Sequence, residues 1–128
     1  MPKIICADDD KLISQSLIEG FTGAGYEAIP AYDGEEAVAK IKEHKPDIVL
    51  LDIMMPKLDG LGVAWELKAN AETASLPIVM LTNLSDTETV SKIMEAGITD
   101  YLLKSEQTID QIIAKVQEVL DRAPKPNA

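Results

Sequence analysis

The sequence has few aromatic residues, one cysteine and a shortage of positive charge. Aromatic residues make up 4% of the 128 positions, so the core has to be built from aliphatic side chains. Cys6 has no second cysteine with which to form a disulfide. Because it stands in the apolar run Ile4–Ala7, we expect its side chain to be a small buried hydrophobe rather than a nucleophile. The formal net charge of −10 argues against nucleic acid as a direct ligand, because phosphate backbones are bound by clustered Lys and Arg.

Long hydrophobic runs are also missing. No segment approaches the ~18 apolar residues of a membrane span, and the N-terminus lacks the apolar stretch of a signal peptide. We therefore expect a cytoplasmic protein without a membrane partner. A chain of 128 residues that is 46% hydrophobic suits one domain. We place this domain at residues 1–122 and a C-terminal tail or linker stub at residues 123–128.

Short apolar segments alternate with amphipathic ones along the whole chain. The apolar segments are Lys3–Ala7, Tyr26–Pro30, Asp47–Leu51, Pro77–Leu81 and Tyr101–Leu103. Three of them show little polar–apolar alternation, which is typical of parallel strands covered on both faces. The segments between them have helical spacing, and two start with a capping box, Ser85–Glu88 and Thr108–Gln111. The pattern predicts an α/β protein: a doubly wound, flavodoxin-like (βα)₅ fold whose five-stranded parallel sheet has the strand order 2-1-3-4-5.

Polar residues come directly after four of these predicted strands. Asp8-Asp9-Asp10 follows the first, Asp52 the third, Thr82 the fourth and Lys104 the fifth. In an open doubly wound sheet the carboxyl ends of the strands border the functional crevice. With the predicted strand order, these side chains face one shallow pocket.

Carboxylates crowded in such a pocket need a cation or a retained proton. Two of them ~4 Å apart repel by about 4 kcal/mol at an effective dielectric constant of 20. Oxygen ligands at the edge of a rigid sheet suit Mg²⁺. Asp9 and Asp52 can each give an oxygen, Asp8 can hold a metal-bound water, and a backbone carbonyl near Met54 can complete the ligand set.

A metal at this point makes phosphorus chemistry feasible. Carboxylates form aspartyl phosphates, and the transferring phosphoryl group spreads negative charge over three equatorial oxygens. With one oxygen on Mg²⁺, Lys104 can meet the second as a point charge and the Thr82 hydroxyl can meet the third.

These residues resemble the receiver domain of two-component response regulators, a chemotaxis-regulator-like domain, from Lys3 to about Arg122. The matching motifs are Asp8-Asp9, Asp52 with Met55-Pro56 and Asp59-Gly60, Thr82, and Ala96-Gly97 ahead of Asp100–Lys104. The resemblance implies Mg²⁺-dependent transfer of a phosphoryl group to Asp52 from a histidine kinase or a histidine phosphotransfer protein. The domain would catalyse its own phosphorylation and dephosphorylation without being a turnover enzyme.

The resemblance also implies a conformational switch. Thr82 would move toward the phosphoryl group, and Tyr101, at the aromatic switch position, would turn inward. This would remodel the face formed by the fourth helix, fifth strand and fifth helix, where a downstream partner or a second copy docks.

The sequence departs from the family pattern at two places. Ser105 follows Lys104 where the family has proline after a cis peptide bond; a cis bond before another residue costs ~3–4 kcal/mol, so we expect a trans bond or an altered loop. The fifth helix lacks the Phe-x-x-x-Glu-Leu pattern and the arginine-rich end of receivers joined to winged-helix DNA-binding domains. A stand-alone receiver, or one from another architecture, is therefore favoured.

Other interpretations of the same residues are open. Asp10 is expected to cap the first helix, and Asp8 and Asp9 alone would suit such a role equally well. A receiver fold that docks partners without being phosphorylated would keep the same elements. A hydrolase with an aspartate nucleophile would normally have a second acid where Met54 stands. A flavodoxin-like flavin carrier would suffer repulsion between Asp8–Asp10 and the flavin phosphate.

Overall fold

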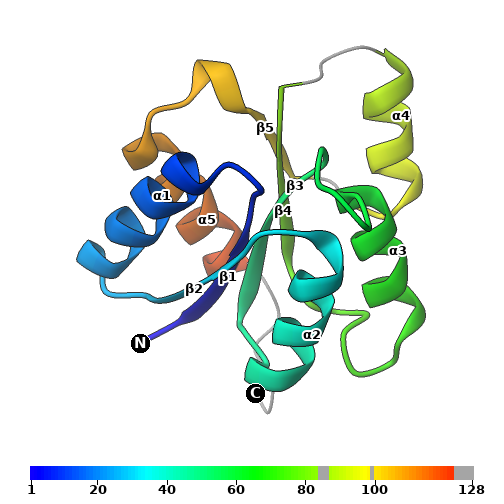
Figure 1. The fold of residues 1–128 in the computed structure, drawn as a ribbon, viewed down its shortest axis with the longest axis horizontal. Coiled ribbons are helices and arrows are strands. Elements are labelled where there is room, and N and C mark those ends of the chain that lie inside the picture. The colour runs from blue at the N-terminus through cyan, green and yellow to red at the C-terminus, as the bar shows by residue number, and fades with distance from the viewer. Residues whose placement is uncertain (84–86, 99, 123–128) are drawn as a thin grey trace.

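Five parallel strands form one sheet in the order β2-β1-β3-β4-β5, as the computed structural model shows (Figure 1). The structure describes residues 1–83, 87–98 and 100–122. The strands are β1 (Lys3–Ala7), β2 (Glu27–Ala31), β3 (Ile48–Asp52), β4 (Ile78–Thr82) and β5 (Tyr101–Leu103). The helices are α1 (Lys11–Gly23), α2 (Gly34–His44), α3 (Gly60–Ala69), α4 (Thr87–Glu95) and α5 (Ile109–Arg122), with a 3₁₀ turn, η1 (Lys104–Glu106), after β5. The predicted fold and strand order are confirmed.

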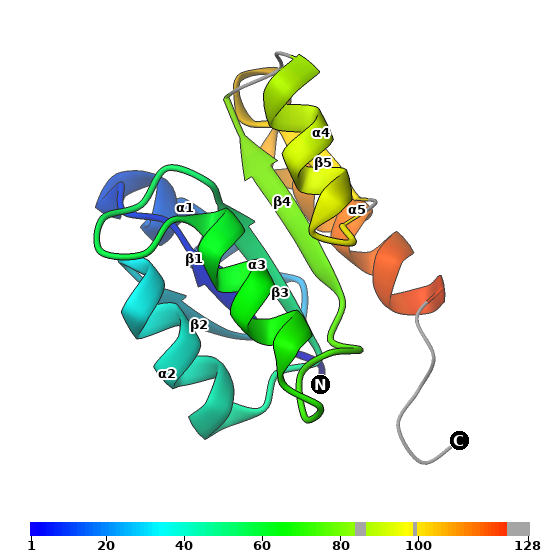
Figure 2. The ribbon, with the colours of Figure 1, turned by 90° about the vertical axis from the view of Figure 1, so that its right-hand side faces the viewer.

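The helices cover both faces of the sheet (Figures 1 and 2). On one face, side chains of α2, α3 and α4 form a core with Ile5 and Ala7 of β1. On the other, α1 and α5 pack on Ile4 and Cys6 of the same strand. Because successive residues of a strand point to opposite faces, a strand between two helical layers buries every residue. This explains the continuous apolar runs in the sequence. Among the described residues, no helix is long and apolar enough to cross a membrane.

Side-chain caps fix the starts of the helices. The Asp10 carboxylate accepts hydrogen bonds from the Leu12 and Ile13 amides, which confirms its predicted role as the cap of α1. Before α5, the Thr108 amide donates to the Gln111 side chain (2.8 Å) and the Gln111 amide to the Thr108 hydroxyl (3.2 Å), the reciprocal pattern of the predicted capping box. The other predicted box, Ser85–Glu88, lies partly outside the described residues, and the predicted tail at 123–128 lies wholly outside them.

The open edge of β2 is covered by side chains of α2. The Glu27 amide donates to the Pro2 carbonyl just before β1, and the Ala31 carbonyl accepts from the Asp8 amide just after it. Because alternate residues of a strand bond to the same side, the backbone of Pro30 faces the open edge. Pro30 has no N–H to offer there, and Lys40 Nζ donates to its carbonyl oxygen at 2.5 Å. One residue beyond β2, the Tyr32 amide donates to the Glu36 carboxylate at 2.9 Å.

Candidate functional site

Four polar residues predicted from the sequence meet at the carboxyl edge of the sheet. Asp8 follows β1, Asp52 and Thr82 are the last residues of β3 and β4, and Lys104 follows β5. β3 and β4 each end one residue later than predicted and include Asp52 and Thr82, because the ladder continues through both residues. Relative exposure is 1% for Asp8, 6% for Asp52 and 0% for Thr82. Three of the four buried polar residues in the described part of the chain thus lie at this edge.

Lys104 connects the two buried carboxylates. Its Nζ lies 2.6 Å from Asp8 Oδ2 and 3.0 Å from Asp52 Oδ2. The contact with Asp52 is a directed hydrogen bond, and the shorter contact with Asp8 is an ion pair. No peptide bond between described residues is cis, so the expected trans bond before Ser105 is confirmed. Lys104 starts the η1 turn and still reaches both carboxylates.

Burial and neighbouring charges together raise the pKa values of both Asp52 and Lys104, for different reasons. Loss of water around Asp52 raises its pKa, the nearby charge of Asp8 raises it further, and the Lys104 ammonium and the Met54 N–H only partly oppose this. Burial alone would lower the pKa of Lys104, but its interactions with the two carboxylates outweigh that effect and raise it. Lys104 therefore stays protonated, and Asp52 holds its negative charge at a cost.

Asp9 completes an acidic cluster that fits a cation. Asp8, Asp9 and Asp52 each offer a carboxylate oxygen, and these oxygens lie within 4.8 Å of one another. Asp9 is exposed to solvent, so the cluster opens outward. Three carboxylates face one ammonium, and all of the candidate ligands are oxygens, which is the donor set that hard divalent cations prefer. The residues present fit such an ion.

The segment after β3 is folded tightly around Asp52. The Met54 amide donates to Asp52 Oδ1 at 3.3 Å, and the Gly60 amide donates to the Ile53 carbonyl at 2.8 Å. A Cβ on Gly60 would collide with the backbone carbonyl of Asp52. Met55 is buried, whereas the Met54 side chain is 64% exposed.

Thr82 and Tyr101 lie on adjacent strands but differ in exposure. Thr82 pairs in register with Leu103 and is fully buried. Tyr101 stands opposite Met80 and is 37% exposed, so it does not belong to the core in this conformation.

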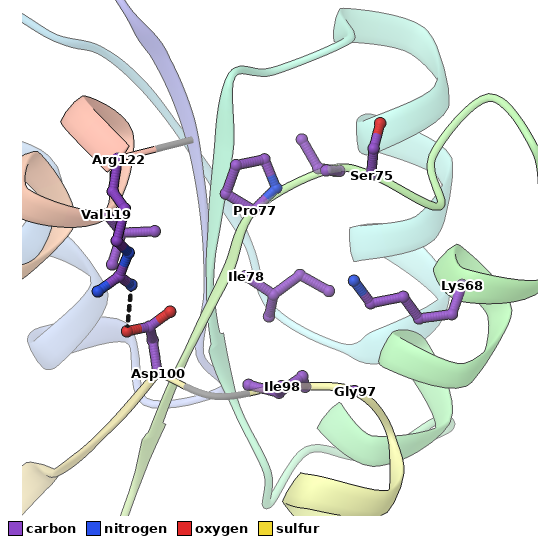
Figure 3. Close-up of a pocket in the computed structure, with 10 residues that line it drawn as sticks. Lys68, Ser75, Pro77, Ile78, Gly97, Ile98, Asp100, Val119 and Arg122 are labelled. Atoms are coloured by element: carbon purple, nitrogen blue, oxygen red, sulfur yellow. Dashed lines mark hydrogen bonds and ion pairs between the residues drawn. The ribbon is translucent and has the colours of Figure 1, made fainter. Parts of the chain in front are cut away.

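A cavity of about 240 Å³ at the opposite end of the sheet is not part of this site (Figure 3). It lies near the carboxyl ends of α3, α4 and α5 and is lined in part by Lys68, Asp100 and Arg122. The charged side chains that line it already have partners within the protein. Lys68 donates to the Ala74 carbonyl, and Arg122 lies 2.6 Å from Asp100 Oδ1. Burial favours the neutral form of Asp100, but Arg122 and Lys115 outweigh it and lower the pKa. These cations compensate helix ends and one carboxylate rather than marking a binding site.

Sequence reasoning did not single out Lys57, which lies in the segment that follows Asp52. This residue has a left-handed backbone (φ 70°) in the segment between Asp52 and α3, and its Nζ lies 3.6 Å from Asp33 Oδ2 at the start of α2. Nothing in the sequence signals this, because lysine is not a residue that favours positive φ.

Comparison with known proteins supports the geometry. A sequence model described as "Response regulator receiver domain" matches residues 4–117. The chain is 34% identical over 125 residues to the DNA-binding dual master transcriptional regulator RpaA of Synechocystis sp., covering 98% of this chain and 52% of that protein. It is 33% identical over 126 residues to the response regulator MprA of Mycobacterium bovis, covering 98% of this chain and 54% of that protein. The chain thus spans about half the length of these curated relatives.

Solved structures agree with these sequence relatives. The receiver domain of the Francisella response regulator 1452 superposes with a TM-score of 0.86 at 34% identity, covering 95% of this chain and 98% of that one. The Vibrio cholerae chemotaxis protein CheY4 gives a TM-score of 0.86 at 28% identity, covering 93% of this chain and 98% of that one.

Proposed function

This chain belongs to the response regulator receiver family, and we propose that Asp52 is its phosphoacceptor in a Mg²⁺-dependent reaction. A receiver is a signalling module rather than a turnover enzyme, and its family membership implies a histidine kinase as partner. The phosphodonor is then a phosphohistidine of the kinase or of a histidine phosphotransfer protein. The observation that carries the proposal is Lys104 Nζ between Asp8 and Asp52, beside three carboxylates that fit a cation.

Each residue has a place in the transfer. Asp8, Asp9 and Asp52 would hold Mg²⁺, with the Met54 backbone carbonyl as a further ligand, and the ion supplies neutralising charge for the phosphoryl group. An Asp52 carboxylate oxygen forms the new O–P bond while the N–P bond to the donor histidine breaks, and the imidazole keeps the electron pair. Lys104 would then exchange part of its contact with Asp52 for a phosphoryl oxygen, and the Thr82 hydroxyl would donate to another.

We infer that the signal leaves through the face formed by α4, β5 and α5. Tyr101 is partly exposed on β5, and it would turn inward when Thr82 moves toward the phosphoryl group. The phosphorylated state is favoured to the extent that Thr82 and Lys104 bind the phosphoryl group only in that state. A downstream partner or a second copy of the chain would bind the remodelled face.

The receiver unit that we propose comprises residues 1–122, with the remaining residues as a tail or linker. RpaA is described as DNA-binding, whereas the −10 net charge of the present chain favours a protein partner over direct contact with nucleic acid.

Intact-protein mass after incubation with acetyl phosphate tests the phosphoacceptor assignment. We expect one added phosphoryl mass in the wild type with Mg²⁺, and none with a chelator or in Asp52→Ala. A wild type that gains no mass even with rapid quenching would instead favour a receiver fold that docks partners without phosphorylation. An adduct that persists in Asp52→Ala would move the phosphoacceptor to another residue.

A further inference from the structure

The segment that carries the proposed Met54 ligand is attached to the start of α2 by a charged residue in an unfavourable backbone conformation. Lys57 has φ 70°, a region that is unfavourable for an L-residue of this kind relative to glycine. Such conformations persist where surrounding contacts enforce them, and they gather at functional sites.

The contacts that hold Lys57 come from the N-terminus of α2. Asp33 uses one carboxylate oxygen to cap this helix, accepting from the Glu36 amide at 2.8 Å, and the other oxygen lies 3.6 Å from Lys57 Nζ. The Asp33 side chain is 17% exposed, against 61% for Lys57, so the carboxylate is the fixed partner and the lysine reaches toward it.

Backbone contacts bring the same two segments together. The Gly34 amide donates to the Pro56 carbonyl at 3.4 Å, and a Cβ on Gly34 would collide with the Leu58 carbonyl. The backbone from Pro56 to Leu58 therefore lies directly on the first turn of α2. No side chain at position 34 could be accommodated without moving it.

The other end of this segment is the proposed cation site. The Met54 amide bonds to Asp52 Oδ1, and the turn from Asp52 to Gly60 closes through the bond from the Gly60 amide to the Ile53 carbonyl. Residues 54–58 thus run between two fixed points: the phosphoacceptor and the cap of α2. The position of the Met54 carbonyl depends on both.

We propose that Lys57, held by Asp33, is a positioning residue for the cation site. Its ion pair fixes residues 54–58 against α2, so that the Met54 carbonyl stands in place before the cation arrives. The inference rests on the proposed function, because it assigns Lys57 a role in the same Mg²⁺ site. It predicts that loosening the ion pair weakens Mg²⁺ binding without unfolding the protein.

Lys57→Met separates positioning from simple electrostatics. Removing a positive charge near a cation site should tighten Mg²⁺ binding if charge alone matters. If Lys57 positions the segment, the Mg²⁺ Kd should instead rise about threefold, the scale of a surface ion pair. The two roles therefore predict opposite signs, and calorimetric titration with Mg²⁺ at 0.15 M salt measures which holds.

Further variants complete the test. Lys57→Arg should restore the wild-type Kd. Asp33→Asn keeps the helix cap, because asparagine caps as well as aspartate, and its combination with Lys57→Met should weaken binding no more than Lys57→Met alone. Lys57→Gly should raise the Kd while leaving the melting temperature within about 2 °C of the wild type, since relief of the left-handed strain offsets the freedom that glycine gives the unfolded chain.

A matched control and a rate measurement make the outcome decisive. Lys92→Met removes a lysine of similar exposure from its 3.2 Å ion pair with Glu88 on α4, and it should leave the Kd unchanged. Phosphorylation of Lys57→Met by acetyl phosphate should be slow at low Mg²⁺ and normal at saturating Mg²⁺. An unchanged or lower Kd in Lys57→Met, with normal wild-type binding, would overturn the inference alone. A wild type that binds no Mg²⁺ would overturn the proposed function and this inference with it.

Discussion

The two halves of the site differ in how firmly they are held. The acidic half consists of β1 and β3 with residues 8–10 and 52–60, and the response half consists of β4, β5, α4 and Lys104. In the acidic half all five residues of β3 are buried, and α3, which follows it, buries four of its ten residues. In the response half β4 is buried like β3, but β5 has three residues, none fully buried, and α4 buries only Ile93 among its nine residues.

This difference assigns cation binding to the acidic half and conformational change to the response half. The carboxylates that fit a cation lie on tightly packed, internally hydrogen-bonded backbone, so the ligand positions are set in advance. Tyr101 lies on β5, and β5 and α4 bury little, so a rearrangement of Tyr101 sacrifices little packing energy. A phosphoryl group on Asp52 could therefore alter the response half while leaving the acidic half in place.

The largest expected effect comes from adding a methyl group to the acidic half. Gly60→Ala places a Cβ against the Asp52 carbonyl, where the backbone cannot yield cheaply, and should cost about 3 kcal/mol or more of unfolding free energy. Gly23→Ala is the matched control: it meets no neighbouring atom at the end of α1 and should be neutral or stabilising by up to ~1 kcal/mol. Urea denaturation measures both. Similar costs for the two variants would show that the acidic half is more pliable than its packing indicates.

Core truncations compare the halves directly. Leu67→Ala in α3 should cost about 3–4 kcal/mol, and Ile93→Ala in α4 about 2 kcal/mol, because a loosely held helix can relax around the cavity. Amide hydrogen exchange should show α4 losing its protection in Ile93→Ala while α3 keeps it. A loss of protection across both helices would mean that the two halves unfold as one unit.

Mg²⁺ should stabilise the fold through the acidic half. At ten times its Kd, an ion that binds only the folded state adds about 1.4 kcal/mol, seen as a higher melting temperature. Asp9→Asn should abolish most of this gain and, by relieving repulsion among the carboxylates, stabilise the metal-free protein. A destabilised Asp9→Asn variant without metal would identify Asp9 as a structural residue instead.

A smaller effect, dependent on pH, is expected at Asp52. Its pKa is raised in the folded state, so its contribution to stability is favourable below the unfolded pKa and is lost as the pH rises through the folded pKa. Asp52→Asn removes the buried charge and should stabilise the protein by about 1 kcal/mol at pH 7, with a smaller gain as the pH falls and more of the wild-type carboxyl becomes protonated. Melting temperatures of both proteins from pH 7 downward test the sign; a gain that grows at acidic pH would contradict it.

The sequence predicted the fold well because burial on both faces leaves a clear pattern. The ranges of β1 and β5 were predicted to the residue, whereas β2, β3 and β4 lie one residue further along the chain. Polar side chains at positions 52 and 82 signalled strand ends, but ladder hydrogen bonds are made by the backbone and continue through both residues. The meeting of Asp8, Asp52 and Lys104 followed from the strand order alone.

Other features depended on contacts that a sequence does not encode locally. The exposure of Tyr101 is set by the conformational state of the response half, and the predicted role of that residue stays a prediction. The left-handed backbone of Lys57 arises from Asp33, 24 positions away in the numbering, and from the close approach of Gly34. Neither Asp33 nor Gly34 can be identified as a partner of Lys57 unless the start of α2 is already known to contact residues 54–58.

The covered edge of β2 affects how this protein behaves among its own copies. A free edge strand presents unpaired backbone groups to which a strand of another chain can add, and this is a common start of aggregation. Pro30 has no backbone N–H to donate, and its carbonyl oxygen already accepts a hydrogen bond from Lys40. Growth of the sheet from this side is disfavoured, so the molecule can stay dispersed at high concentration while the opposite edge, at β5, is left for regulated encounters.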